Sequence, residues 1–428
     1  MILANGIQYE SSMQDRILDG LEERLNVTLA GPPLEPETVL NAIDRLGQLV
    51  AQGAFDRQID ALQIDGAEQY KALAIRLLRR DYLEFKLRTE LGADFRPDYV
   101  TQPPAGLPAL RVLARPLGVL LHIAAGNADG LPAFSVAEGL VTGNINLLKL
   151  PQADNGLSLE IIQALLELEP RLRDYIYVFD TPSSDVAAIK RMADLADGIV
   201  VWGGDEAISA VRRFVKPGTK LIEWGHRLSF AYLSGQRPRE ELAALAEHIV
   251  ATRQLLCSSC QVIYLDTEDM AVLEGFCHRF WPILEQAAKA HRPNTLGAVA
   301  ELSLRSYTDR LEALLEGGSP RPWTSPLCAL LPREDAELEL SPLLGRVLVK
   351  RLPRNQILPT LRQKKEYLQT VGLGCAPQDR EALIRIFARA GLTRITFPGG
   401  MSESIPGEAH DGAYPLRRYT RMIDVALP

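Results

Sequence analysis

From Leu117 to Gly225 the sequence alternates short apolar runs with helical patterns, and this alternation restricts the fold more than any other feature. Each run is apolar along its whole length, as expected for a strand that helices cover on both faces. Amphipathic segments separate the runs, so the pattern predicts a doubly wound α/β fold with a parallel sheet. The predicted strands are GVLLHIAA, NINLLKL, YIYVFDT, GIVVWGG and TKLIEWG.

The segments on either side of this region predict further structure. Residues 1–95 read as mostly helical, with one helical pattern that ends at Gly92. The proline-rich segment 94–116 is predicted to be a linker or an exposed hairpin, because proline disfavours a central strand. After residue 226 a second α/β domain is expected. Its predicted strands are RLSFAYLS, CQVIYLD, RVLVKRL, YLQTVGLG and RITFPGG, and LRRYTRMIDVAL near the end of the chain predicts a last strand.

Composition excludes several classes of protein. The chain has 428 residues and a formal net charge of −7, which argues against a protein that coats nucleic acid. No apolar run is long enough to span a membrane, and the N-terminus lacks the pattern of a secretory signal. Five cysteines, an odd number, favour a reducing compartment over a disulfide framework. We therefore expect a cytoplasmic protein without a membrane span or a nucleic-acid partner.

The first predicted sheet has the residues of a ligand site where its strands end. Ligands of parallel sheets bind beyond the carboxyl ends of the strands. Gly203, Gly204 and Asp205 open the helix after the fourth strand, where a pyrophosphate can lie on free backbone N–H groups. The G-x-G-x-x-G fingerprint of dinucleotide-binding proteins is absent after the first strand, so this generic signal for a nucleotide is weak.

The segment RQLLCSSCQ contains Cys257 and Cys260 and allows four interpretations. A zinc site needs a second pair of ligands, and the other three cysteines are isolated along the chain. A thioredoxin-like pair begins a helix after a strand, whereas this pair follows a helical pattern and leads into a strand. Two core cysteines are the third interpretation, although their immediate neighbours are polar. The fourth is one nucleophile with a bystander.

The segments EWGHRLS and RQLLCSSCQ resemble the glutamate and cysteine motifs of the aldehyde dehydrogenase superfamily. More closely, the chain is similar to the LuxC-type acyl-CoA reductases, which make fatty aldehydes from acyl thioesters. The resemblance covers about residues 110–420. The segments that carry it are RPLGVLLHIAAGNADGLPAFSVAEGLVTGNINLLKLP, VVWGGDEAI, CSSCQ, GLTRITFPGGM and HDG, in the order of the family.

This resemblance implies an aldehyde dehydrogenase-like α/β fold with a Rossmann-type cofactor domain and a second, catalytic α/β domain. The cofactor domain would comprise residues 100–226 and the catalytic domain residues 227–400. The helical region 1–99 would pack on the cofactor domain. The tail 401–428 would pack on the first domain or form an interface strand with a second subunit.

The resemblance also assigns three catalytic residues. Cys257 would be the nucleophile, and Cys260, which stands where the family usually has proline, would be the bystander. Asn127 matches an asparagine after the first strand and would stabilise an oxyanion together with the Cys257 backbone N–H. A helix-capping role is the alternative for Asn127. Glu223 would be a general base or proton relay, and a salt-bridged carboxylate at a strand end is its alternative.

The cofactor implied by the resemblance is NADPH, with NADH as an alternative. Lys149 matches the lysine that holds the adenosine ribose or its phosphate. Gln152 stands where NAD-preferring relatives often carry glutamate, and an amide does not repel a 2′-phosphate as a carboxylate would. Gly203, Gly204 and Asp205 would receive the pyrophosphate. No metal is expected.

Two motifs leave questions open. The E-x-F-G-P segment of the superfamily, whose glutamate holds the nicotinamide ribose, is absent, and RPWTSPL at 321–327 is the nearest candidate. His410 and Asp411 in the HDG segment resemble a family motif, and a turn near a subunit interface is the alternative.

The expected function is NADPH-dependent reduction of a fatty acyl-CoA or acyl-carrier thioester to the aldehyde through an acyl-cysteine. Two alternatives remain open. One is a cysteine-dependent acyltransferase or thioesterase, in case the altered ribose-binding segment has abolished nicotinamide binding. The other is a non-catalytic assembly subunit. By resemblance, an acyl-activating synthetase is an expected partner, and the chain is expected to form a homodimer or homotetramer.

Overall fold

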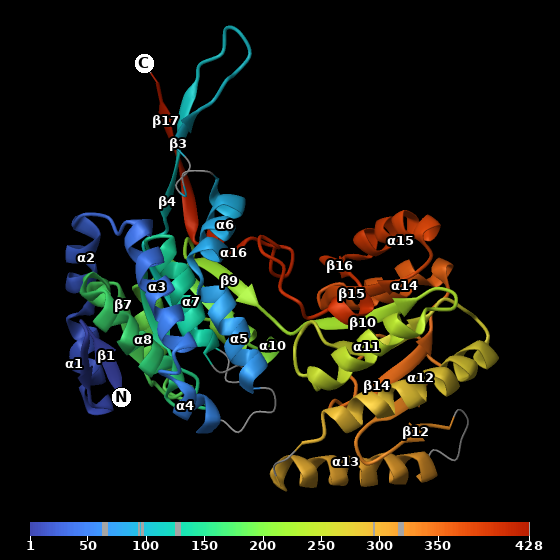
Figure 1. Ribbon diagram of the computed structural model, residues 1–428. Helices are drawn as coiled ribbons and strands as arrows, with labels where there is room; N and C mark the ends of the chain where they lie inside the picture. The colour runs from blue at the N-terminus through green and yellow to red at the C-terminus, as the bar shows by residue number, and fades with distance from the viewer. Residues whose placement is uncertain are drawn as a thin grey trace. The chain divides into compact units, whose positions relative to one another are not determined.

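The computed structural model (Figure 1) describes residues 1–61, 67–92, 95, 98–124, 130–293, 296–315 and 321–427. Two compact units make up the chain. Unit 1 consists of Met1–Gly225 together with Ile405–Pro428, and unit 2 is the continuous segment His226–Ser404. Each unit contains a seven-stranded sheet with helices, so the predicted α/β class is confirmed.

The main sheet of unit 1 has the order β2-β1-β7-β6-β5-β8-β9. The five strands from β7 to β9 are parallel, and β1 adds to β7 in the antiparallel direction. The strand order reverses between β5 and β8, which is where a doubly wound sheet binds its ligand. The strands are β1 (Ile2–Ala4), β2 (Ile7–Tyr9), β5 (Val119–Ile123), β6 (Ile145–Lys149), β7 (Ile176–Phe179), β8 (Gly198–Trp202) and β9 (Lys220–Trp224).

Helices cover both faces of this sheet because consecutive residues of each strand point to opposite sides. On β5, Leu120 packs with α3, α7 and α8, whereas Val119 and Leu121 pack with α1, α2, α9 and α10. The five predicted strands and four connecting helices are confirmed. The helices of unit 1 are α1 (Gln14–Asp19), α2 (Leu21–Ala30), α3 (Pro36–Ala51), α4 (Asp56–Ala61), α5 (Ala67–Leu78), α6 (Arg80–Leu91), α7 (Leu131–Val141), α8 (Leu157–Leu168), α9 (Val186–Asp194), α10 (Asp205–Arg212) and α16 (Pro415–Arg418).

The helical N-terminal prediction needs two corrections. The chain begins with the hairpin β1–β2, which extends the sheet instead of starting a helix. The pattern that ends at Gly92 forms two helices, because Arg79 is extended with ψ of 139°. Asp44 accepts a hydrogen bond from the Arg80 backbone N–H at 3.0 Å and so caps the start of α6. Gly92 ends this helix at φ of 98°, as predicted from its freedom at positive φ.

Unit 1 also carries a small three-stranded sheet, which we call the arm. It consists of β3 (Asp98–Val100), β4 (Leu110–Pro116) and β17 (Thr420–Ala426), in the order β17-β4-β3. The proline-rich segment therefore forms a hairpin, one of its two predicted forms, and the predicted last strand pairs along all of β4. In Figure 1 the arm extends away from the main sheet of unit 1, and residues 421–426 are all exposed.

The sheet of unit 2 has the order β12-β13-β14-β11-β10-β15-β16 and is parallel except for the edge strand β12. Two apolar clusters cover its two faces. In the described part of the chain, no helix combines the length and the apolarity needed to cross a membrane. The elements of unit 2 are β10 (Leu228–Leu233), α11 (Arg239–Ala251), β11 (Cys260–Leu265), α12 (Met270–Ala290), α13 (Leu296–Leu315), β12 (Trp323–Thr324), β13 (Ala329–Pro332), β14 (Arg346–Arg351), α14 (Ile357–Leu361), β15 (Leu368–Gly374), α15 (Pro377–Ala390) and β16 (Arg394–Thr396).

Candidate active site

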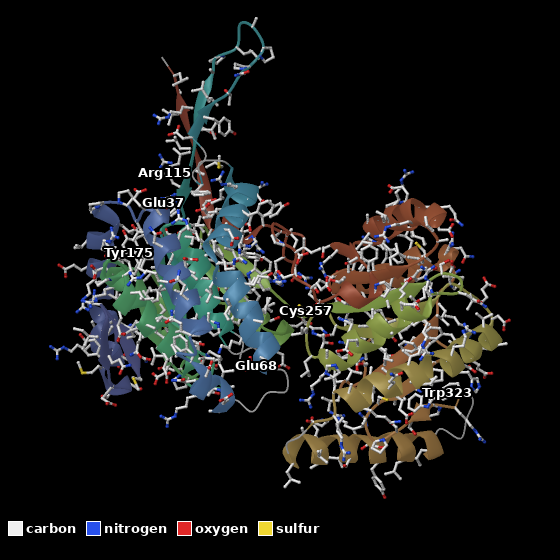
Figure 2. All side chains as sticks on the ribbon, in the orientation of Figure 1. Glu37, Glu68, Arg115, Tyr175, Cys257 and Trp323 are labelled. Carbon is white, nitrogen blue, oxygen red and sulfur yellow. The ribbon has the colours of Figure 1, made fainter. Side chains whose placement is uncertain are left out.

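Cys257 lies in the loop between α11 and β11, at the amino-terminal edge of the unit 2 sheet (Figure 2). It is the only exposed cysteine of the five, because the other four are buried. A nucleophile must be reached by its substrate, so accessibility alone separates Cys257 from the rest. We call residues 252–259 the cysteine loop.

An unusual backbone conformation begins the cysteine loop. Arg253 and Gln254 have φ of 49° and 61°, in the left-handed region that costs energy for residues other than glycine. Buried side chains hold this turn. Gln254 Nε2 donates to the Cys260 carbonyl at 2.9 Å, and Gln261 Nε2 donates to the Gln254 carbonyl at 2.9 Å. Such strain persists only where neighbouring contacts over-determine it.

His248 fixes the end of the loop from α11. Its Nε2 accepts a hydrogen bond from the Cys260 backbone N–H at 3.2 Å, so the ring is neutral there. Burial, together with the positive charge of Arg394, lowers the pKa of His248 to about 4. The histidine therefore keeps its acceptor nitrogen across the physiological pH range.

Two polar side chains from neighbouring strands contact Cys257 itself. Ser229 Oγ on β10 donates to the Cys257 carbonyl at 2.7 Å. Gln369 Nε2 on β15 donates to Cys257 Sγ at 3.2 Å. Neither residue is among those that the sequence analysis selected. The sequence gives no sign that Gln369 lies beside the cysteine, because the two residues are 112 positions apart.

Cys260 differs from Cys257 in every respect that matters for reactivity. It is the first residue of β11, it is fully buried, and burial raises the pKa of its thiol to about 12. Its Sγ donates to the Val262 carbonyl at 3.4 Å. A thiol in this setting is inert, so its environment is that of a core residue. Within the described residues no group of three or more His, Cys, Asp or Glu could hold a metal ion.

Lys149 occupies the carboxyl edge of the unit 1 sheet, at the end of β6. Its side chain is buried, with 3% of the residue exposed, and its Nζ donates to Ser183 Oγ at 2.9 Å. Among the described residues no carboxylate lies within ion-pair distance of this ammonium group. Burial lowers the pKa of Lys149. A buried cation that has no counter-ion among the described residues is suited to binding an anionic ligand.

The other predicted cofactor residues lie on the same edge. Gly204 caps α10 with extended backbone, φ of −73° and ψ of 176°, and Asp205 is the first residue of that helix. Gly203 donates its N–H to the Trp224 carbonyl at 3.1 Å, which joins the ends of β8 and β9. Gln152 is exposed in the loop after β6. The Gly203 N–H is therefore used within the protein, so an anion at the start of α10 would have to be met by N–H groups that follow it.

Glu223 forms the ion pair that was the alternative to a catalytic role. Arg212 holds both carboxylate oxygens, at 2.5 Å and 2.6 Å, in a bidentate arrangement. The arginine is 63% exposed, so solvent screens this pair and its strength is small. Glu223 can act as a base only when the pair opens. Asn127, the third predicted catalytic residue, lies outside the described residues.

The HDG segment forms a turn that packs on aromatic residues at the ends of β8 and β9. The His410 ring lies 4.8 Å from that of Trp224 and 5.5 Å from that of Trp202, and the two tryptophans stack at 5.4 Å. His410 and Ala413 exchange backbone hydrogen bonds, and Asp411 takes φ of 49°. The repeated tryptophan before glycine, in VVWGG and IEWG, was the only sequence signal for this cluster.

The segment RPWTSPL, the nearest candidate for the missing E-x-F-G-P motif, lies at the edge of the unit 2 sheet. Trp323 lies on the edge strand β12, and its ring contacts that of His278 at 5.2 Å. Figure 2 shows Trp323 well away from Cys257 within unit 2. The predicted residues thus form two groups. Lys149, Glu223 and the start of α10 share the carboxyl edge of unit 1, and Cys257 lies in unit 2.

The fold is that of the aldehyde dehydrogenases. Lactaldehyde dehydrogenase from Escherichia coli superposes with a TM-score of 0.68 and 15% identity, over 98% of this chain and 92% of the other. The glyceraldehyde-3-phosphate dehydrogenase GapN from Methanocaldococcus jannaschii, solved in complex with NADP, gives a TM-score of 0.70 and 12% identity, over 98% of this chain and 95% of the other. The predicted aldehyde dehydrogenase-like fold is therefore confirmed.

Within this fold the chain belongs to the acyl-CoA reductase (LuxC) family, whose sequence model matches residues 32–422. The long-chain acyl-protein thioester reductase of Aliivibrio fischeri is 23% identical over 323 residues, which cover 74% of this chain and 66% of that protein. The enzyme of the same name from Photorhabdus luminescens is 25% identical, over 74% of this chain and 65% of that protein. The match thus spans just under two thirds of these relatives.

Proposed function

We propose that this protein reduces an acyl thioester to the aldehyde, with NADPH as the reductant and Cys257 as the nucleophile. The observation that carries the proposal is the environment of the Cys257 thiol. It is the one exposed thiol, it lies in a loop that is held on several sides, and its sulfur accepts a hydrogen bond from an amide. Membership of the acyl-CoA reductase (LuxC) family supports the reaction class.

The first step is an acyl transfer to the cysteine. The Cys257 thiolate attacks the carbonyl carbon of the thioester, and the new C–S bond gives a tetrahedral intermediate with a negative oxygen. Donors that stabilise this oxygen lower the barrier, and the proposed donors are the Cys257 backbone N–H and Asn127. The bond to the departing sulfur then breaks. The carrier leaves as a thiolate, and the acyl group remains on Cys257.

The residues of unit 1 fit a dinucleotide with a 2′-phosphate. Lys149 is a buried cation whose hydrogen-bond partner is the Ser183 hydroxyl, so a phosphate would complete its charge pairing. Gln152 introduces no carboxylate that would repel this phosphate. The N-terminus of α10, at Gly203, Gly204 and Asp205, would receive the pyrophosphate. When bound, reduced nicotinamide would supply a hydride to the acyl carbonyl carbon. The C–S bond to Cys257 then breaks, which releases the aldehyde and returns the cysteine as a thiolate. NADH is the alternative cofactor.

The proposed substrate is a fatty acyl group on CoA or on a carrier protein. The names of the relatives specify a long-chain acyl group on a protein, and the family description specifies acyl-CoA. An acyl-activating synthetase is the proposed upstream partner. For assembly we propose a homodimer or homotetramer, because the exposed residues of the arm include the apolar Met422, Ile423 and Val425.

Turnover of the purified protein tests this proposal. Acyl-CoAs of increasing chain length are supplied with NADPH or NADH, and both cofactor oxidation and aldehyde are measured. We expect equimolar aldehyde and oxidised cofactor, with NADPH preferred. Cys257→Ala should abolish the reaction, and Cys260→Ala should retain most of it, since the buried thiol has no proposed role. Full activity in Cys257→Ala would refute the assignment of Cys257 as the nucleophile.

One observation favours a second candidate function. The nicotinamide-ribose motif is absent, and Trp323 of its nearest counterpart lies away from Cys257. An enzyme that stops at the acyl-cysteine and passes the acyl group to water or another thiol would need no nicotinamide. Thioester cleavage without cofactor oxidation in the same assay would identify this activity.

A further inference from the structure

The unit 2 sheet is irregular beside Cys257. Between Ser229 and Phe230 of β10, the neighbouring strand β11 advances from Cys260 to Val262, so it contains one extra residue there. On the other side, between Leu228 and Phe230, β15 advances from Leu368 to Val371 and also contains one extra residue. Extra residues of this kind redirect side chains and occur next to active sites.

Both irregularities supply a buried glutamine to the cysteine loop. The extra residue of β11 is Gln261, whose amide holds the left-handed turn at Gln254. Its Oε1 accepts from the Ser341 hydroxyl at 2.7 Å, so both ends of that amide are used within the protein. On β15 the extra residue falls at Gln369 and Thr370, and Gln369 reaches the sulfur of Cys257. The two glutamines thus hold different parts of one loop.

The contacts of Gln369 orient its amide. The residue is 5% exposed, and its Oε1 lies 3.4 Å from the Ser229 hydroxyl and 3.4 Å from the Thr370 hydroxyl. The Thr370 hydroxyl can donate to this oxygen, whereas the single Ser229 hydrogen goes to the Cys257 carbonyl, and the NH2 group of Gln369 faces Sγ at 3.2 Å. Ser229 accepts from the Thr370 backbone N–H at 3.1 Å and donates to the Cys257 carbonyl. One connected set of hydrogen bonds therefore holds both the backbone and the sulfur of the cysteine.

We propose that Gln369 is a positioning residue for Cys257: its side-chain amide favours the thiolate and fixes the direction in which the sulfur points. This inference rests on the proposed role of Cys257 as nucleophile. An N–H donor stabilises an anionic sulfur more than a neutral thiol, so the hydrogen bond shifts the equilibrium toward thiolate while the proton leaves to solvent. A fixed sulfur also meets the carbonyl carbon of the substrate at a reproducible angle.

Among the described residues, the charged side chains that begin the loop or pack near it have contacts of their own. Arg253 begins the loop and pairs with Glu301 on α13 at 3.9 Å. The Arg394 guanidinium on β16 is held by the carbonyls of Met401 and Glu403. His248 is neutral because burial lowers its pKa to about 4. The neutral amide of Gln369 contacts Sγ directly, at 3.2 Å.

The test is the pH dependence of Cys257 alkylation by iodoacetamide, followed by peptide mass spectrometry, in wild type and two variants. Gln369→Met keeps the length of the side chain without a donor, and Gln369→Glu replaces the donor with an oxygen. In Gln369→Met we expect the apparent pKa for alkylation to rise by about one unit, which slows labelling at neutral pH about tenfold. Gln369→Glu should raise it further, because a carboxylate repels the thiolate.

Thr370→Val is the matched control. Thr370 is the next buried residue of β15, and valine has nearly its shape, but its hydroxyl does not contact Sγ. The pKa of Cys257 should change much less in this variant than in Gln369→Met, because only the 3.4 Å contact with the amide oxygen is lost and the NH2 donor to Sγ remains. The proposal is overturned if both Gln369 variants alkylate with the wild-type pH profile, or if Thr370→Val shifts the profile as much as Gln369→Met does.

Two features of the alkylation experiment keep its result interpretable. If Gln369→Met fails to fold, Gln369→Glu preserves both size and polarity at the site and carries the same question. Alkylation needs neither an acyl donor nor a cofactor. A protein that forms no aldehyde therefore still reports whether Gln369 controls the thiol, and a failure of the proposed reaction is distinguished from a failure of this inference.

Discussion

At the scale of single residues, environment and not residue type decides what each candidate can do. Cys257 and Cys260 are three positions apart, yet their environments differ. Cys257 is exposed and accepts a hydrogen bond from an amide, whereas Cys260 is fully buried in the sheet. Sequence motifs selected Cys257, Lys149 and Glu223. They could not select Gln369, because its contact with the cysteine exists only after β15 has paired with β10.

Lys149 gives the first residue-scale prediction. In Lys149→Met, the dissociation constant for NADPH should rise at least about tenfold, because a charge-assisted hydrogen bond is lost. The apo protein should be no less stable than wild type, since the variant removes a buried cation that has no counter-ion in the part of the chain that the structure describes. Fluorescence titration and urea unfolding measure the two effects. Unchanged NADPH affinity would exclude Lys149 from the cofactor site.

His248 gives a prediction on pH. Its pKa is about 4 in the folded protein and about 6.5 when unfolded, so the unfolded chain binds the extra proton between these values. The free energy of unfolding should therefore fall as the pH drops from 6.5 to 4, by roughly 2 kcal/mol at pH 5 for this residue. His122, which is fully buried and has a pKa of about 4, should add a similar loss.

His248→Gln is the variant that isolates this effect. Glutamine offers an oxygen to the Cys260 N–H and does not titrate. We expect urea unfolding at pH 7 and pH 5 to show a smaller fall in the free energy of unfolding than in wild type. The difference should be the roughly 2 kcal/mol that one histidine contributes. An identical fall in the free energy of unfolding in the two proteins would show that protonation of His248 is not its cause.

At the scale of elements, the apolar runs of β5 to β9 were predictable because strands covered on both faces need little beyond continuous apolar character. The β1–β2 hairpin was not, since three-residue strands such as Ile2–Ala4 are too short for a periodic signal. The break between α5 and α6 depends on Asp44, which caps the helix from a distant position. Both features also depend on remote segments, because β1 pairs with β7 and Asp44 caps α6.

The arm carries the element-scale prediction. Ile423 and Val425 lie on one face of β17, since residues two apart in a strand share a face, and they are 39% and 38% exposed. The double variant Ile423→Asp with Val425→Asp should lower the oligomeric mass measured by sedimentation velocity, because charges would be buried in the proposed interface. Asp424→Ser, on the other face, is the control. An unchanged mass with both variants would place the interface elsewhere.

At the scale of the whole molecule, the chain consists of two units, each with its own sheet and two apolar clusters. The sequence indicated the order of these elements, and the resemblance to acyl-CoA reductases indicated the class of fold. Packing of the tail on the first domain was one of two expectations, but neither source indicated that Thr420–Ala426 would pair with β4. Strand pairing across such a sequence separation depends on tertiary structure and leaves no local signal.

Unit 2 gives the prediction at this scale. It is a continuous segment whose two apolar clusters contain only its own residues. The fragment 226–404 should therefore fold alone, with cooperative urea unfolding and protected amides in β10, β11 and β15. A fragment with the circular dichroism and exchange rates of an unfolded chain would show that unit 2 depends on the rest of the protein.

The central claim is that Cys257 carries the acyl group, and intact mass spectrometry of the protein with acyl-CoAs in the absence of cofactor tests it most directly. We predict a mass increase of one acyl group in wild type and in Cys260→Ala, none in Cys257→Ala, and loss of the adduct as aldehyde when NADPH is added. An adduct that persists in Cys257→Ala, or no adduct with any acyl donor, would contradict the claim.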